Sequence, residues 1–297
     1  MADGVSGQPL SYKTGGEGST LNLNADFWHR YWERQPLFLE QIDNAAFGDV
    51  FSLDKFEELL AFGAMRKGFV TLVDHGVNVP PTAFCKALDV GGFAHDDIVD
   101  PVVVENFRSA GATTILAAVH LYCRTVGYAA EMLACSTGRE IEAHAFHTPA
   151  GTGGLAPHFD GEDNFLLQLE GTKYWTVTPP SPGQLPVVGG RPVNGYQSDP
   201  ARVVKYTLRP GDLLYIPRGW LHSSVTERAA SLHITFQVLP SLLCTAISER
   251  MEGELEKLGL TIATLPGPGC RASTEVIGAI RHLASSLDEW ADHLEEK

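Results

Sequence analysis

Two histidines and an aspartate in the second half of the sequence have the residue types and spacing of a metal-binding set. His158 and Asp160 stand two residues apart, and residues two apart share one face of a β-strand. His222 follows a segment that predicts a turn, a strand over 213–216 and a second turn, so we expect it to open the next strand of the same barrel. Two imidazoles and one carboxylate on one side of a metal ion leave the opposite side open to other molecules.

The strength of this prediction comes from the combination of segments. A His-x-Asp pair is weak by itself, and a lone histidine in a strand is more often a hydrogen-bonded core residue. Here three independent pieces of sequence fit one barrel. We therefore predict His158, Asp160 and His222 as metal ligands and catalytic residues, in the set of two histidines and one carboxylate that is typical of non-haem iron(II) oxygenases.

A lysine lies between these two segments. Lys173 begins an otherwise apolar and aromatic strand, which we expect to form a hairpin with the strand over 165–169. The lysine is either exposed or turned inward to pair with a carboxylate of a bound diacid. A charge-assisted bond of that kind contributes ~1.5–3 kcal/mol, whereas a buried lysine without an anion is costly. Tyr174, Trp175 and Trp220 either shape the same cavity or simply pack in the core.

The surrounding pattern predicts strands with helices before and after them. From residue 144 to 239, short apolar runs are broken by glycine and proline, which is typical of a sandwich or barrel. Periodicity predicts helices over 25–35, 53–65, 113–136, 241–258 and 275–296, and a strand over 69–73. The helix over 113–136 is apolar nearly all round, so we expect it to be buried against a sheet.

Composition restricts the class of protein. The 297 residues are 44% hydrophobic and include no apolar run of membrane-spanning length. Five scattered cysteines without a CxxC pair indicate reduced thiols and a cytoplasmic protein. The net charge of −14 disfavours nucleic acid and suits a basic protein or peptide partner, although solubility explains it equally well. Residues 1–20 are polar and rich in glycine, so we expect a disordered leader.

Several segments together resemble the JmjC ribosomal oxygenases, also called the cupin-4 family. They are residues 149–151, 157–160, 167–175 and 210–222, with an aromatic N-terminal helix over 27–37. The resemblance covers roughly residues 25–240. It implies an all-β core with flanking helices, in the form of a double-stranded β-helix (jelly-roll or cupin) over 21–240. It also implies a helical dimerisation region over 241–297 and therefore a homodimer.

The resemblance also implies the chemistry. It makes His158, Asp160 and His222 the ligands of Fe(II), and Lys173 the partner of the distal carboxylate of 2-oxoglutarate. The expected reaction is hydroxylation of an amino-acid side chain in a protein or peptide, typically a ribosomal protein. 2-Oxoglutarate would be decarboxylated to succinate and carbon dioxide as a C–H bond of the substrate is oxidised.

Three features of the sequence depart from the family, two of them near the expected cosubstrate. The asparagine that usually stands fourteen residues before the first metal histidine is replaced by His144. A serine expected on the strand over 232–237 corresponds to Thr235 or Gln237. The 57 residues after Pro240 are too few for both a dimerisation bundle and the family's winged helix. These departures leave open an enzyme that acts on a natural-product peptide.

Other functions are open as well. The chain could be a 2-oxoglutarate oxygenase of a small-molecule natural product, or a cupin that uses its metal for isomerisation or hydrolysis. It could also be a non-catalytic JmjC-like binding module. A cupin of the second kind needs no anchor for a diacid, so Lys173 argues against it, and an intact metal set argues against the binding module. Consumption of 2-oxoglutarate by the protein with iron would separate these possibilities.

Overall fold

The structure is a computed structural model that describes residues 23–42, 50–62, 64–180, 200–241, 243–260, 271 and 273–295. The expected leader over 1–20 lies outside these ranges. The chain divides into two compact units with the boundary after Pro240. Each unit is described by itself below.

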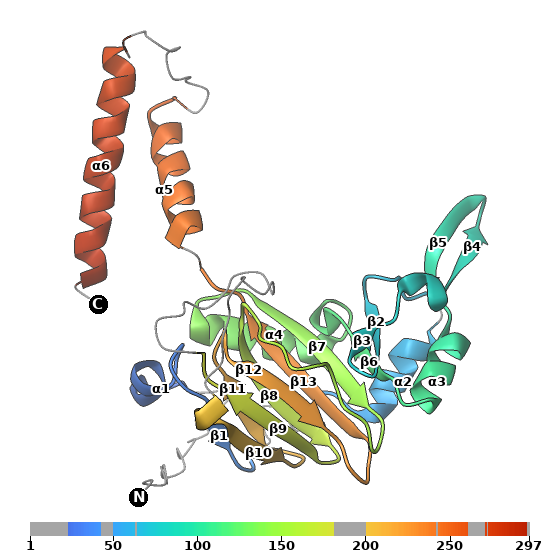
Figure 1. Cartoon of the computed structure of the whole chain (residues 1–297). Coiled ribbons are helices and arrows are strands. Elements are labelled where there is room, and N and C mark those ends of the chain that lie inside the picture. The colour runs from blue at the N-terminus through green and yellow to red at the C-terminus, as the bar shows by residue number, and fades with distance from the viewer. Residues whose placement is uncertain are drawn as a thin grey trace, which may run out of the picture. The chain divides into compact units, whose positions relative to one another are not determined.

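The first half of unit one combines helices with short strands (Figure 1). Its helices are α1 (Ala25–Arg30), α2 (Leu53–Ala61), α3 (Pro101–Ser109) and α4 (Arg124–Thr137). Its strands are β1 (Leu37–Leu39), β2 (Val70–Asp74), β3 (Val77–Asn78), β4 (Cys85–Val90), β5 (Phe93–Val99) and β6 (Thr113–Leu116). Short 3-10 turns lie at Pro81–Ala83 and Val119–Leu121.

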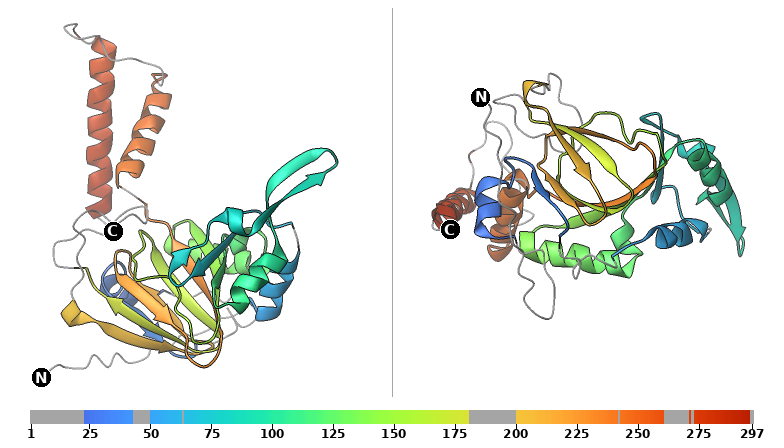
Figure 2. Two further views of the ribbon diagram at one scale, coloured as in Figure 1. Left: turned by 45° about the vertical axis from the view of Figure 1, so that its right-hand side comes forward. Right: turned by 90° about the horizontal axis from the view of Figure 1, so that it is seen from below.

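The second half of unit one is made of strands. They are β7 (Ile141–Thr148), β8 (Asp163–Glu170), β9 (Lys173–Thr178), β10 (Val204–Leu208), β11 (Leu213–Ile216), β12 (Leu221–Val225) and β13 (Ser231–Val238), with a 3-10 turn at Pro200–Arg202. The large sheet has the order β1-β11-β8-β13-β7-β6-β2-β3, and the small sheet has the order β10-β9-β12. Every pairing is antiparallel. Seen from below, the two sheets face each other around an interior, and α4 covers the outside of the large sheet (Figure 2).

Side chains on the central strands alternate between two environments. On β13, Leu232, Ile234, Phe236 and Val238 join the apolar cluster that the helices cover. The residues between them, His233, Thr235 and Gln237, line a cavity between the sheets. Because a strand presents successive residues to opposite faces, one strand serves both the core and the site. A second apolar cluster fills the rest of the interior and consists of Leu166, Trp175, Val177, Leu208, Leu214, Ile216 and Trp220.

Unit two is a pair of helices, α5 (Leu243–Lys257) and α6 (Thr274–Glu295). Arg250 of α5 donates to the carbonyl of Ser286 at 3.2 Å and lies over the ring of Trp290. Glu254 accepts from His282 at 2.9 Å. Arg250 precedes Glu254 along α5, but its partners Ser286 and Trp290 follow His282 along α6. The two helices therefore run antiparallel. Ala279 and Leu283 are buried along this seam.

The structure corrects two expectations about elements. The helix predicted over 113–136 is wrong at its start, because Thr113–Leu116 is the fully buried strand β6 and only Arg124–Thr137 is helical. A short apolar run buried on both sides has no periodicity that distinguishes strand from helix. The predicted hairpin is also wrong. β8 and β9 follow each other in sequence but belong to different sheets. The chain passes from the large sheet to the small sheet in the turn at Gly171, which has a positive φ.

Cys85, Cys123 and Cys135 are free thiols. The helices that the structure describes include none that is both long and apolar enough to cross a membrane.

Candidate metal centre and anion pocket

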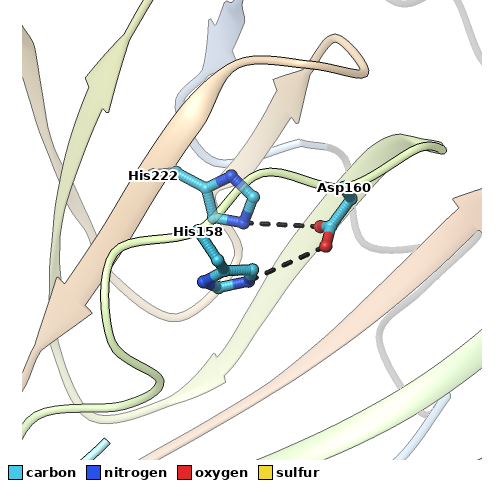
Figure 3. Close-up of side chains that lie close together, drawn as sticks. All are labelled: His158, Asp160 and His222. Carbon is cyan, nitrogen blue, oxygen red and sulfur yellow. Dashed lines mark ion pairs between the residues drawn. The ribbon is translucent and has the colours of Figure 1, made fainter. Parts of the chain in front are cut away.

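The two predicted histidines and the aspartate lie together at the cavity between the sheets (Figure 3). Nε2 of His158 is 3.7 Å from Oδ1 of Asp160, and Nε2 of His222 is 3.4 Å from Oδ2. One donor atom from each residue lies within 4.8 Å of the others. The spacing of His158 and Asp160 suggested a regular strand, but His158 does not lie in one. It forms a single antiparallel bridge to His222, with backbone hydrogen bonds of 3.1 and 2.7 Å, so the pairing places both rings at one point.

The remaining ring nitrogens show how the histidines are oriented. Nδ1 of His158 is 2.8 Å from the carbonyl of Ala156, and Nδ1 of His222 is 2.9 Å from the carbonyl of Trp220. A carbonyl only accepts, so in the neutral ring Nδ1 carries the hydrogen and Nε2 has a free lone pair. Both Nε2 atoms face Asp160. This arrangement of ring and carbonyl partner is the usual one in histidines that bind metals.

Asp160 is oriented by a neighbour that the sequence analysis did not single out. Nδ2 of Asn164 on β8 donates to Oδ2 of Asp160 at 2.7 Å. The hydrogen bonds and the nearby imidazoles outweigh burial and lower the pKa of Asp160 to about 2. The carboxylate is therefore ionised at neutral pH. Although burial opposes it, the hydrogen bond to Asp160 raises the pKa of His222, and a metal ion would take the place of that proton. The two imidazoles and the carboxylate are thus a donor set that fits a divalent transition metal.

Lys173 lies in the same cavity and is buried, with 1% of its surface exposed. Its ammonium donates to Oγ1 of Thr148 at 3.0 Å and lies 3.4 Å from Nδ1 of His233. No carboxylate pairs with it in the part of the chain that the structure describes. Burial lowers the pKa of Lys173 to about 7. A buried ammonium without a counter-ion is costly, so an anion in the cavity would be stabilising.

Gly154 leaves space beside this ammonium. A Cβ atom at this position would lie 3.0 Å from Oγ of Ser224 and 3.9 Å from Nζ of Lys173. Any larger side chain would fill the cavity at the point where an anion must approach. The residues present therefore fit a small molecule that carries a carboxylate at this end.

The other predicted cosubstrate residues line the cavity too. His144 on β7 lies opposite Thr235 on β13, and Gln237 is the next inward residue along β13. Nδ1 of His144 accepts from the backbone N–H of Ala118 at 3.3 Å. Burial is the main cause that lowers the pKa of His144 below its ordinary value. Its ring is therefore neutral at neutral pH.

The aromatic residues divide between cavity and core. Trp175 lines the cavity as expected, and its ring centroid is 6.0 Å from that of His222. Trp220 belongs to the apolar cluster that fills the rest of the interior. Tyr174 is not among the cavity-lining residues, because it points to the opposite face of β9 from Lys173 and Trp175. The cavity-lining residues that sequence analysis did not single out include Phe146, Asn164, Ser224 and His233.

Comparison with known proteins shows which families this chain is similar to. Residues 124–243 match the JmjC domain family. The chain is 29% identical over 288 residues to ribosomal oxygenase 1 of Gallus gallus, which covers 90% of this chain and 46% of that protein. It is 31% identical over 209 residues to the bifunctional lysine-specific demethylase and histidyl-hydroxylase NO66 of Brugia malayi, covering 69% of this chain and 28% of that protein.

A solved structure shows the same fold. The ribosomal oxygenase YcfD from Escherichia coli, in complex with cobalt and 2-oxoglutarate, superposes with a TM-score of 0.52 at 18% identity. The match covers 91% of this chain and 67% of that one. The fold is thus of the JmjC or cupin type, with antiparallel sheets and flanking helices. Residues 124–243 match the JmjC domain, and the chain is similar to the ribosomal oxygenases, but it spans less than half the length of the curated relatives named above.

Proposed function

We propose that this chain is an Fe(II)- and 2-oxoglutarate-dependent dioxygenase that hydroxylates an amino-acid side chain in a protein or peptide. The observation that carries the proposal is one cavity with two different ends. One end has two imidazole nitrogens and a carboxylate that face one another, and the other has a buried ammonium with which no described carboxylate pairs. A 2-oxo diacid has a chelating end for the first and a carboxylate for the second.

Each group has a definite role in this proposal. His158, Asp160 and His222 hold Fe(II), and Asn164 keeps the carboxylate of Asp160 in place. Lys173 binds the distal carboxylate of 2-oxoglutarate, while Thr235, Gln237 and His144 line the wall beside it. When bound, iron supplies the activation of oxygen that couples decarboxylation of the cosubstrate to oxidation of a C–H bond. The apolar cluster in the rest of the barrel excludes water from one side of the site.

A protein or peptide substrate is supported by the relatives. They are named ribosomal oxygenase and histidyl-hydroxylase, and the matched YcfD structure holds cobalt and 2-oxoglutarate. The acidic chain, with a net charge of −14, is complementary to a basic partner such as a ribosomal protein or a basic peptide. The alternatives are oxidation of a small-molecule natural product and a binding module without turnover.

The test is incubation of the full chain with Fe(II), 2-oxoglutarate and candidate proteins or peptides, followed by mass spectrometry. We expect succinate to form together with a single oxygen addition on one substrate. Turnover of small molecules alone would indicate that the chain oxidises a small-molecule natural product. Binding of 2-oxoglutarate without succinate formation under any condition would favour the binding module, and metal-dependent chemistry without 2-oxoglutarate would favour a different cupin reaction.

His144 gives a prediction about pH. When it protonates, Nδ1 can no longer accept from Ala118, so the wall beside the cosubstrate changes. Because burial lowers the pKa of His144, we expect activity of the wild type to fall only below the ordinary histidine value near ~6.5. His144→Asn should lose this component of the pH–rate profile while keeping activity at neutral pH. Identical profiles for the two proteins would show that His144 is only a packing residue.

The C-terminal helices support a homodimer as part of the proposal. Ile280 and Leu294 of α6 are 54% and 55% exposed, and Ile277 is 40% exposed, although all three are large and apolar. Pairing with a second copy would remove such surface from water. We expect the full chain to elute as a dimer in light-scattering measurements at micromolar concentration, and Ile280→Glu to shift it toward monomer. Arg281→Glu, on the exposed neighbour, is the control. A monomeric wild type would rule out the dimer.

A further inference from the structure

His233 is a second basic residue at the anion end of the cavity, and the roles above make no use of it. It lies on β13 and is buried between two aromatic rings. Its ring stacks on Phe146 with centroids 4.7 Å apart and an interplanar angle of 12°. Trp175 contacts it edge-on, with centroids 5.5 Å apart and an angle of 90°. These contacts hold the imidazole in one orientation next to Lys173.

The contact with Lys173 determines which ring nitrogen of His233 carries the hydrogen. Nζ of Lys173 lies 3.4 Å from Nδ1 of His233. An ammonium can only donate, so once Lys173 is protonated Nδ1 accepts and the ring hydrogen lies on Nε2. Nε2 of His233 has no hydrogen-bond partner among the residues with described positions, and His233 lines the cavity. The Nε2–H group of His233 is therefore a fixed donor that is available to a molecule in the cavity.

The hydrogens of Lys173 alone are too few for a carboxylate with two oxygens. An ammonium has three hydrogens. Oγ1 of Thr148 accepts one at 3.0 Å, and Nδ1 of His233 takes a second. One hydrogen remains for an anion, whereas a carboxylate accepts through both oxygens. A second donor is needed at the same place.

We propose that His233 is this second donor, binding the distal carboxylate of the cosubstrate through Nε2–H while Lys173 binds it through the remaining ammonium hydrogen. The inference rests on the proposed function, because it assumes that a 2-oxo diacid occupies the cavity. It adds that the site recognises a carboxylate by two donors from opposite sheets, since Lys173 lies on β9 and His233 on β13. Selectivity for a diacid over a monoacid then depends on both residues.

The experiment compares three substitutions that separate the two ring nitrogens. His233→Gln places an amide N–H near the position of Nε2, His233→Asn keeps a polar group only near Nδ1, and His233→Phe keeps the aromatic packing without either nitrogen. Binding is measured by calorimetry without oxygen, with Mn(II) at the metal site. The two ligands are 2-oxoglutarate and 2-oxopentanoate, which has the same chain length but no distal carboxylate.

We expect His233→Phe and His233→Asn to weaken 2-oxoglutarate binding about tenfold, which is the effect of about 1.4 kcal/mol. His233→Gln should recover most of that loss, and all variants should bind 2-oxopentanoate as the wild type does. Equal losses for both acids, or no loss in His233→Phe, would overturn the role of His233. The role of His233 would also be overturned if Ser224→Ala, and not the His233 variants, weakened binding of 2-oxoglutarate without affecting 2-oxopentanoate. Ser224 is the other polar residue beside Gly154. A wild type that binds Mn(II) but not 2-oxoglutarate would overturn the proposed function as well.

Discussion

Asp160→Ala should abolish both metal binding and formation of succinate. The aspartate supplies the only carboxylate in the cluster of three donor atoms within 4.8 Å that the described residues form. Without it, two neutral imidazoles remain, and they cannot balance the charge of a divalent ion in a partly buried site. We expect His158→Ala and His222→Ala to have the same effect, because each removes one of the three donors. Calorimetric titration with Mn(II) and a succinate assay measure the two results.

The matched control for this substitution is Asp74→Ala. Asp74 also lies beside a histidine, with Oδ1 2.7 Å from Nδ1 of His75, but that pair is exposed and is not part of the cavity wall. The control should bind metal and turn over normally. All variants should still unfold in a single cooperative thermal transition, since none of the substituted side chains belongs to the apolar core. Succinate formation at the wild-type rate in Asp160→Ala would contradict the metal assignment.

Much of the fold could be predicted because strand and turn signals are local. The sequence around residues 210–222 has turn residues at both ends of a buried apolar run, and the structure has β11 and β12 there. The pairing of strands could not be predicted in the same way. β8 and β9 are separated by a two-residue turn and look like a hairpin, yet they belong to different sheets. Which strands pair depends on how the whole barrel closes, and no local signal contains that information.

The site was predictable where residue type alone suggests chemistry. His158, Asp160, His222 and Lys173 are polar or charged residues beside apolar ones in the sequence, and the structure brings them to one cavity. His233 is equally unusual, and alternation along its strand puts it on the same face as Thr235 and Gln237. His233 could therefore have been predicted from its position two residues before Thr235 on the same strand. Asn164 could not, because its role depends on a contact of 2.7 Å with Asp160 that no spacing rule gives.

Binding of 2-oxoglutarate should weaken as the pH rises above 7. Burial lowers the pKa of Lys173 to about 7 in the protein without cosubstrate. A bound carboxylate favours the ammonium and raises this pKa, so the protonated form is the one that binds. Above pH 7, binding must first take up a proton, and the affinity should fall by about tenfold for each further pH unit until the pKa of the complex is reached. Below pH 7 the lysine is already charged and its contribution should be constant.

Two variants at the same position separate this titration from other effects. Lys173→Met removes the charge and should weaken 2-oxoglutarate binding by at least about tenfold at pH 7, with no remaining slope above that pH. Lys173→Arg keeps a charge that does not titrate in this range, so its binding should be independent of pH between 7 and 9 even if the larger group lowers the affinity. His233 and His147 are the neighbouring bases that act on or near Lys173, and burial lowers the pKa of each below its ordinary value. They are therefore neutral throughout this range, and a slope that persists in Lys173→Met would assign the titration to a group outside the anion pocket.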